Sequence, residues 1–148
     1  GSVDSSVLNS WMKHPFFGSI PPKSLDRGAF SVDDIGASLP EDGAATLAAF
    51  TAASVEKARG FFPRPVSRWL ICGGGRHNRF VMAKLAENLG VAVRSVDELD
   101  WDGDAVEAEC FGYLAVRHLE NLPLSFPGTT GVGAPCPGGR LYQTKKAA

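Results

Sequence analysis

The chain of 148 residues is long enough to form one domain with a hydrophobic core. Its composition is ordinary for a globular protein, with 44% hydrophobic and 21% charged residues, and its formal net charge of −1 indicates no basic surface for nucleic acid. No apolar run approaches the length of a membrane span. The charge and the lack of such a run lead us to expect neither a nucleic-acid partner nor a membrane partner.

Residues 1–40 are expected to hold one short helix followed by loops. Gly1-Ser2 has the composition of a leftover from tag removal, so we expect that the true start of the gene does not lie in this chain. An apolar stripe at helical spacing predicts a helix over residues 3–13, with Asp4 or Ser5 as its N-cap. Prolines and polar residues beyond this helix indicate extended connections.

A longer helix is predicted from about Glu41 to Gly60, where the glycine would end it. The residues expected on its apolar face are Leu47, Phe50, Thr51, Val55 and Ala58. The segment is also rich in alanine, whose small side chain allows a neighbouring element to approach closely. We therefore expect this helix to pack tightly against another one.

The middle of the chain is predicted to be a βαβ unit. A strand over residues 66–72, a helix over 77–89 and a strand over 91–96 follow one another, so the two strands should be parallel. The first strand is expected to be buried. Two strands make a poor sheet, which leaves two alternatives. Either weak strands lie within residues 16–35, or the sheet is completed by chain that is not present here.

The last predicted helix runs from Asp104 to about Asn121. Apolar residues lie around much of its circumference, so we expect it to be well buried. Beyond it, residues 123–140 contain four prolines and five glycines, a density that predicts irregular structure.

The cysteines and histidines are few and scattered. The three cysteines are Cys72, Cys110 and Cys136, and an odd number without close spacing argues against a disulfide framework and fits a reducing cytoplasm. The histidines are equally isolated, so we expect no metal site built from these groups.

The most informative motif is Gly73–Gly75, which lies between the first predicted strand and the helix that follows it. Such a turn lets a ligand approach the backbone and favours a nucleotide site. The dinucleotide fingerprint is incomplete because Asn78 stands at the third glycine, although Asp97 is placed as a ribose-binding acid would be. The Walker pattern is absent. A purely structural strand-to-helix turn is the alternative.

Five segments, taken together, resemble the C-terminal part of the bacterial anhydro-N-acetylmuramic acid kinases. The segments are His14–Phe17 with Pro21–Ser24, Ala45–Leu47 with Thr51-Ala52, Cys72–Asn78, Asp104–Ala108 with Phe111, and Phe126–Gly131. Their order and spacing cover nearly the whole chain, which makes the combination specific.

The resemblance implies an α/β fold that forms part of a ribonuclease-H-like lobe of the actin-like ATPase and sugar-kinase superfamily, with an incomplete sheet in this chain. It also implies a cytoplasmic enzyme that uses ATP, magnesium and water to open 1,6-anhydro-N-acetylmuramic acid and phosphorylate its 6-oxygen, in peptidoglycan recycling. The implied partner is a missing N-terminal lobe, and a homodimer is an open alternative. The implied divisions are 3–40, 41–122 as the nucleotide-side lobe, and a 123–148 tail.

The resemblance also implies roles for individual residues. Gly73, Gly74 and Gly75 match a turn that closes on the adenosine part of ATP, and Asn78 matches the polar position after it, where a helix N-cap is the alternative. Glu107 matches a glutamate on the sugar side of the cleft, with a helix-dipole role as its alternative.

Two further motifs match the family in loops. Lys23 and Ser24 match a proline-loop motif, where a ligand or lobe-orienting role stands against a solvated loop. Thr129, Thr130 and Gly131 match a terminal loop for which we expect a structural role.

The chain lacks the family's motifs for catalysis and phosphate binding. The family's general base is an aspartate in an Asp-Thr-Gly-Pro-Gly-Asn type loop, and neither this loop nor the first phosphate loop occurs here. We therefore assign no catalytic residue and no metal ligand, and expect this chain alone to be inactive and to bind nucleotide weakly. The alternatives are a small Rossmann-like dinucleotide module using Gly73, Gly75 and Asp97, or a non-catalytic interaction domain.

Overall fold

A computed structural model of the protein describes residues 1–36 and 39–143. The chain divides into two compact units, Gly1–Val106 and Glu107–Ala148, and each is described by itself. In chain order the helices and strands are α1 (Ser5–Trp11), α2 (Pro40–Ala58), β1 (Arg68–Ile71), α3 (Arg79–Leu89), β2 (Ala92–Ser95), α4 (Val106–Leu119) and α5 (Pro127–Thr130). None of the helices within the described ranges is long and apolar enough to cross a bilayer.

The first helix forms where the sequence predicts it. The Asp4 carboxylate accepts hydrogen bonds from the amides of Ser6 and Val7, at 2.8 and 3.0 Å, so it is the N-cap of α1. The Asp4 amide in turn donates to Oγ1 of Thr46 on α2, at 2.9 Å. This bond fastens the start of α1 to the first half of α2.

An aromatic cluster joins the N-terminal segment to α2. Phe50 of α2 lies against Trp11 and Phe30, with ring centroids 5.0 and 4.8 Å apart. Residues 16–35, all of them described, form 3-10 turns and contain no strand. The alternative that hidden strands in this segment complete the sheet is therefore wrong.

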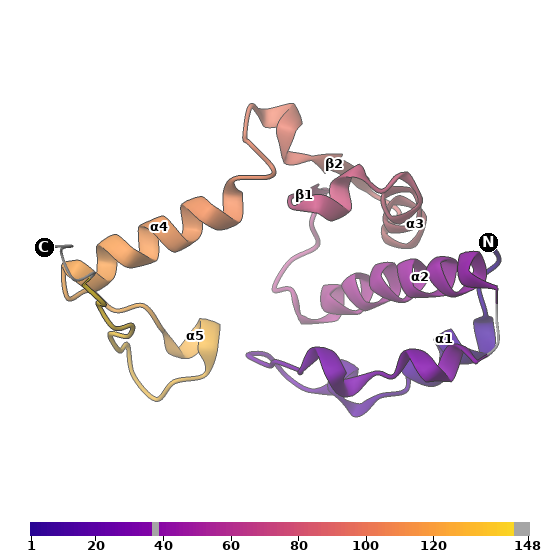
Figure 1. The fold of residues 1–148 in the computed structure, drawn as a ribbon, viewed down its shortest axis with the longest axis horizontal. Coiled ribbons are helices and arrows are strands. Elements are labelled where there is room, and N and C mark those ends of the chain that lie inside the picture. The colour runs from indigo at the N-terminus through magenta and orange to yellow at the C-terminus, as the bar shows by residue number, and fades with distance from the viewer. Residues whose placement is uncertain (37–38, 144–148) are drawn as a thin grey trace, which may run out of the picture. The chain divides into compact units, whose positions relative to one another are not determined.

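Helix α2 lies between α1 and α3 (Figure 1). Its buried residues are small, namely Gly43, Ala45, Thr46, Ala49 and Ala52. The close packing predicted from the alanines is confirmed, because small side chains let two helix backbones approach. The predicted apolar face is wrong in part, since Leu47 and Thr51 are exposed. The prediction selected the larger hydrophobic residues, whereas the residues that are buried on α2 are the smaller ones.

The predicted βαβ unit is confirmed, and its two strands are parallel, with Arg68 opposite Ala92 and Ile71 opposite Ser95. Leu85 and Leu89 of α3 form a core with Ala52 of α2. Trp69, Ile71 and Val93 pack against this core from one face of the sheet. Gly90 ends α3 in the left-handed conformation, with φ 62°.

Strand β1 is less buried than expected. Arg68 is exposed and the other three residues are half-buried. The reason is the sheet itself, which has two strands in the part of the chain that the structure describes. Two strands leave an edge on each side, so the expectation of a fully buried strand is wrong, and completion of the sheet by further chain stays a prediction.

Helix α4 also departs from the prediction. No residue of α4 is buried, and Phe111, Tyr113, Val116 and Leu119 are between 58% and 64% exposed. Apolar residues around a helix predict burial only if a partner is present to cover them. The tail after α4 is more ordered than expected, because it contains α5 and an antiparallel bridge between Ser125 and Cys136.

Candidate functional site

The glycine turn begins where β1 ends. Gly73 has φ 75° and ψ 176°, a region that is essentially restricted to glycine. Its amide donates a 2.8 Å hydrogen bond to the carbonyl oxygen of Gly103, which lies beyond β2. The chain then makes a 3-10 turn over Gly74–His77 before α3 begins. Gly73 is thus required by backbone conformation.

Gly74 and Gly75 need a different explanation. Neither has a positive φ, and a Cβ atom built on either would meet nothing within 4 Å among the described residues. The packing of the described chain therefore does not require glycine at these two positions. Bare backbone facing open space is the arrangement that lets a ligand approach the main chain closely.

Arg76 follows the glycines, and its side chain is only 5% exposed. Its guanidinium donates to both carboxylate oxygens of Asp104, at 2.5 and 2.8 Å, and to Asp97, at 2.8 Å. It also donates to the carbonyl oxygen of Gly73, at 3.1 Å. The two carboxylates raise the pKa of Arg76 further above its usual value, so this side chain remains charged.

Asp97 is held by several donors. Besides Arg76, it accepts hydrogen bonds from the Ser95 hydroxyl, at 2.6 Å, and from the Gly103 amide, at 3.0 Å. These bonds, led by the one from Arg76, hold the pKa of Asp97 well below its usual range. Arg76 similarly lowers the pKa of Asp104. The geometry gives Asp97 a structural task, which disfavours the ribose-binding role of the Rossmann-like alternative.

Asn78 is the N-cap of α3. Its side-chain oxygen accepts hydrogen bonds from the amides of Phe80 and Val81, at 3.0 and 3.1 Å. The capping alternative is therefore confirmed. The side chain is exposed beside the turn, so contact with a ligand through its amide nitrogen stays a prediction.

The predicted residues are brought together only in part. Gly73–Gly75 and Asn78 lie in one turn of the first unit. Glu107 lies in the first turn of α4, exposed to solvent, in the second unit. Sequence reasoning missed the role of Arg76. The signal was available only in three dimensions, because its two carboxylate partners are 21 and 28 residues away.

The proline-loop motif and the terminal loop motif both make contacts within the protein. The Lys23 ammonium donates to the carbonyl oxygen of Phe16, at 2.7 Å, and lies 4.3 Å from the ring centroid of Phe61. A solvated loop does not describe this half-buried lysine, although Ser24 is exposed. Thr129 and Thr130 both donate to the carbonyl oxygen of Phe126, as a structural role requires.

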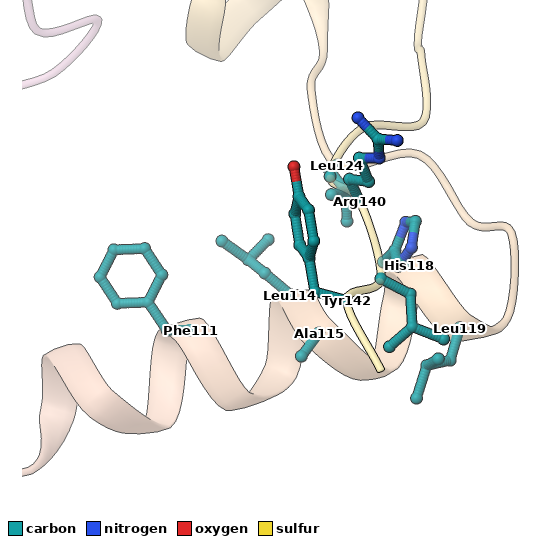
Figure 2. Close-up of a pocket in the computed structure, with 10 residues that line it drawn as sticks. Phe111, Leu114, Ala115, His118, Leu119, Leu124, Arg140 and Tyr142 are labelled. Carbon is teal, nitrogen blue, oxygen red and sulfur yellow. The ribbon is translucent and has the colours of Figure 1, made fainter. Parts of the chain in front are cut away.

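The second unit carries an apolar groove of about 440 Å³ on α4. Figure 2 shows Leu114 and His118 of α4 with Tyr142 from the tail. The His118 ring nitrogen Nδ1 lies 2.6 Å from the carbonyl oxygen of Gly138, which holds the tail against the helix. Within residues 1–36 and 39–143, no three His, Cys, Asp or Glu side chains are grouped so that they could hold a metal ion.

Comparison with known proteins decides the family. A sequence model described as anhydro-N-acetylmuramic acid kinase matches residues 1–144. The chain belongs to the anhydro-N-acetylmuramic acid kinase family. The predicted resemblance is therefore confirmed, and the Rossmann-like module is not favoured.

Curated members of the anhydro-N-acetylmuramic acid kinase family are similar over nearly the whole chain. A relative from Rhodospirillum rubrum is 50% identical over 142 residues, which cover 96% of this chain and 38% of the relative. One from Rhizobium rhizogenes is 50% identical over 97% of this chain and 38% of its own length. One from Acidiphilium cryptum is 48% identical over 100% of this chain and 42% of its own length. The chain thus spans about two-fifths of the length of these kinases.

Proposed function

We propose that this chain is the C-terminal part of an ATP-dependent kinase that opens 1,6-anhydro-N-acetylmuramic acid and phosphorylates it to N-acetylmuramic acid 6-phosphate. The observation that carries the proposal is the 46–50% identity to relatives that share this kinase name, over 95% or more of the chain. The proposal includes a ribonuclease-H-like lobe, a cytoplasmic location and the segment divisions 3–40, 41–122 and 123–148. A homodimer remains an alternative assembly.

Gly73, Gly74, Gly75 and Asn78 are proposed to form the adenosine side of the ATP site. The bare backbone of Gly74 and Gly75 supports this assignment, because a flat base or ribose can approach it. Charge supports the nucleoside rather than the phosphates. The cation of the turn, Arg76, is already paired with two carboxylates, which leaves it less available to a triphosphate.

Magnesium is assigned to the rest of the kinase. The two carboxylates beside the glycine turn, Asp97 and Asp104, are both paired with Arg76, which disfavours them as magnesium ligands. Glu107 is proposed to contact the sugar. Its exposed carboxylate in the first turn of α4 forms no ion pair within the described residues, so it is available to a hydroxyl group of a ligand.

The apolar surface of α4 is proposed to pack against the remainder of the same kinase. This surface consists of Phe111, Tyr113, Val116 and Leu119, each more than half exposed. The first relatives are about two and a half times as long as the matched segment, so ample chain exists to cover it. Large exposed apolar side chains in this number indicate an interface. The same remainder would complete the two-stranded sheet.

Phosphorylation of 1,6-anhydro-N-acetylmuramic acid in the presence of ATP and magnesium tests this function. The complete kinase, meaning the longer protein that contains this chain, should form the 6-phosphate, as should the Rhodospirillum rubrum relative used as a control. The 148-residue chain alone should not, because it contains no Asp-Thr-Gly-Pro-Gly-Asn type loop. The proposal is contradicted if this chain alone forms the product, or if the complete kinase does not form it.

A further inference from the structure

We infer that Arg76 is a positioning residue of the nucleotide site, which sets the shape of the Gly73–Gly75 turn by fastening it to Asp97 and Asp104, and that it is not a phosphate ligand. The inference rests on the proposed function for its ligand. An arginine directly after a glycine turn would ordinarily be read as a cation for phosphate. The contacts of this side chain give it a different task.

The guanidinium joins three separate parts of the first unit. Nη1 donates to the carbonyl oxygen of Gly73, and Nε donates to Asp97. Nη1 and Nη2 together donate to the two carboxylate oxygens of Asp104. Gly73 therefore has both of its polar backbone groups engaged, since its amide donates to Gly103. Such a doubly tied residue fixes where the next two glycines lie.

Gly103 provides independent support. A Cβ atom at this position would overlap Nε of Arg76 and would lie 2.8 Å from its Cδ and Cζ atoms. The overlap involves the held, buried part of the side chain and not a free end. Glycine at 103 therefore gives Arg76 the space in which it packs. The amide of Gly103 is also tied to Asp97, so the whole loop is shaped around the guanidinium.

The donors of Arg76 are directed into the protein. Four of its five N–H groups donate to protein acceptors, two of them to Asp104, Nε to Asp97 and a second Nη1 hydrogen to the carbonyl oxygen of Gly73. A phosphate that accepts two hydrogen bonds from this guanidinium would have to displace one of these acceptors. Asp104 lies three residues before Glu107, so the same grip also holds the segment that leads into α4.

Binding of adenosine and of ATP to the complete kinase separates the two roles. If Arg76 positions the turn, Arg76→Gln weakens the binding of both ligands by a similar factor of about ten, because the turn that contacts them is no longer held by the guanidinium. Asp104→Asn also lowers the affinity for both ligands. The double variant binds each ligand no more weakly than the single variant that has the lower affinity. Arg94→Gln is the matched control, because Arg94 is exposed and pairs with Glu98 at the surface.

The opposite pattern overturns the inference. A phosphate ligand would show a loss for ATP and none for adenosine in Arg76→Gln, and a tighter ATP complex in Asp104→Asn, which frees the guanidinium. Unchanged affinity for both ligands also overturns it. In steady-state kinetics we expect a higher KM for ATP with kcat changed by less than about twofold, since no group at the reacting atoms is altered.

Hydrogen exchange gives a readout that needs neither turnover nor nucleotide. In Arg76→Lys, which keeps the charge but loses the fork, the Gly73 amide should exchange about ten times faster while the Leu89 amide changes by less than about twofold. Equal exchange at Gly73 in both proteins overturns the inference. Activity of the unaltered complete kinase tests the proposed function alone, so the failure of one is distinguishable from the failure of the other.

Discussion

Arg76 and Asp104 are joined by two parallel hydrogen bonds, of 2.5 and 2.8 Å, across 28 residues of chain. One partner follows the glycine turn and the other precedes α4. Because the guanidinium is planar and its fork matches a carboxylate, this pair fixes orientation as well as distance. The turn and the loop after β2 are thereby held as one unit, and several measurable consequences follow from this contact.

Acid should weaken this contact. Arg76 lowers the pKa of Asp104 and of Asp97 below the unfolded value of about 3.9. A lowered carboxyl pKa contributes stability that is present above the unfolded pKa and is lost as pH falls through the folded one. The melting temperature of the chain should therefore decrease as the pH is lowered below about 4, and this decrease should be less steep in Asp104→Asn. Melting curves between about pH 2 and 7 measure the slope.

The neighbours of Asp104 qualify the size of this effect. Both carboxyls are partly exposed, so solvent screens the ion pairs, and His77 Nε2 lies 3.6 Å from Asp104. Asp26→Asn, a change of the same type on an exposed loop carboxylate, is the control. An acid limb with the same slope in Asp104→Asn as in the unaltered chain would contradict the expected contribution.

Gly103→Ala should destabilise the chain by about 1–3 kcal/mol, the usual penalty of inserting a methyl group into a packed site. The new Cβ would overlap Arg76, which cannot move without releasing its carboxylates. Gly112→Ala is the matched control, because its Cβ on α4 meets nothing within 4 Å. That change should stabilise the helix by up to about 1 kcal/mol. Urea unfolding of both variants should thus give effects of opposite sign.

Sequence periodicity was sufficient for α3 and for the parallel strands, because the residues that pack, such as Leu85 and Leu89, are large and regularly spaced. It was insufficient for α2, where Ala45, Ala49 and Ala52 form the contact and hydrophobicity alone ranked larger residues higher. For α4 the pattern described a helix that a partner would bury, but a pattern cannot indicate whether the partner is in the same chain.

The candidate site was predictable where it depends on local chemistry. The glycine turn and the Asn78 cap are signals within a few residues of one another. The contacts of Arg76 depend on tertiary structure, since the pairing of β2 with β1 places Asp97 and Asp104, which follow β2, beside the turn. Polar pairs at long sequence separation have no periodic signature, so the two aspartates were indistinguishable from their acidic neighbours.

Leu89→Ala should cost about 2–5 kcal/mol of unfolding free energy, because it leaves a cavity in the core. Leu89 is 1% exposed and packs with Ala52 and Leu85. Leu47→Ala on α2 removes the same atoms from an exposed position and should change stability by less than about 1 kcal/mol. Equal losses in chemical denaturation would show that the core does not lie where α2 meets α3.

Asn78→Ala should destabilise α3 by about 1 kcal/mol, because the amides of Phe80 and Val81 lose their acceptor. Asn78→Asp keeps an acceptor at the cap and should retain most of that stability. The pair of variants also separates capping from ligand binding. If the complete kinase loses affinity for uncharged adenosine in Asn78→Asp while its stability is kept, the side-chain nitrogen contacts the nucleoside, and unchanged affinity assigns Asn78 to the cap alone.

Val116→Ser tests whether the apolar surface of α4 is covered in the complete kinase. Valine and serine have similar helix propensities, and Val116 is 58% exposed here, so this chain should lose less than about 0.5 kcal/mol. If the remainder of the kinase packs on α4, the same substitution there removes a buried side chain and should cost about 1.5–3 kcal/mol. Urea unfolding of both proteins, with Glu120→Ser directly after the last residue of α4 as a polar control, measures the difference. A small loss in both proteins would show that the rest of the kinase leaves Val116 in solvent, and a loss in this chain that grows with protein concentration would assign the surface to a second copy.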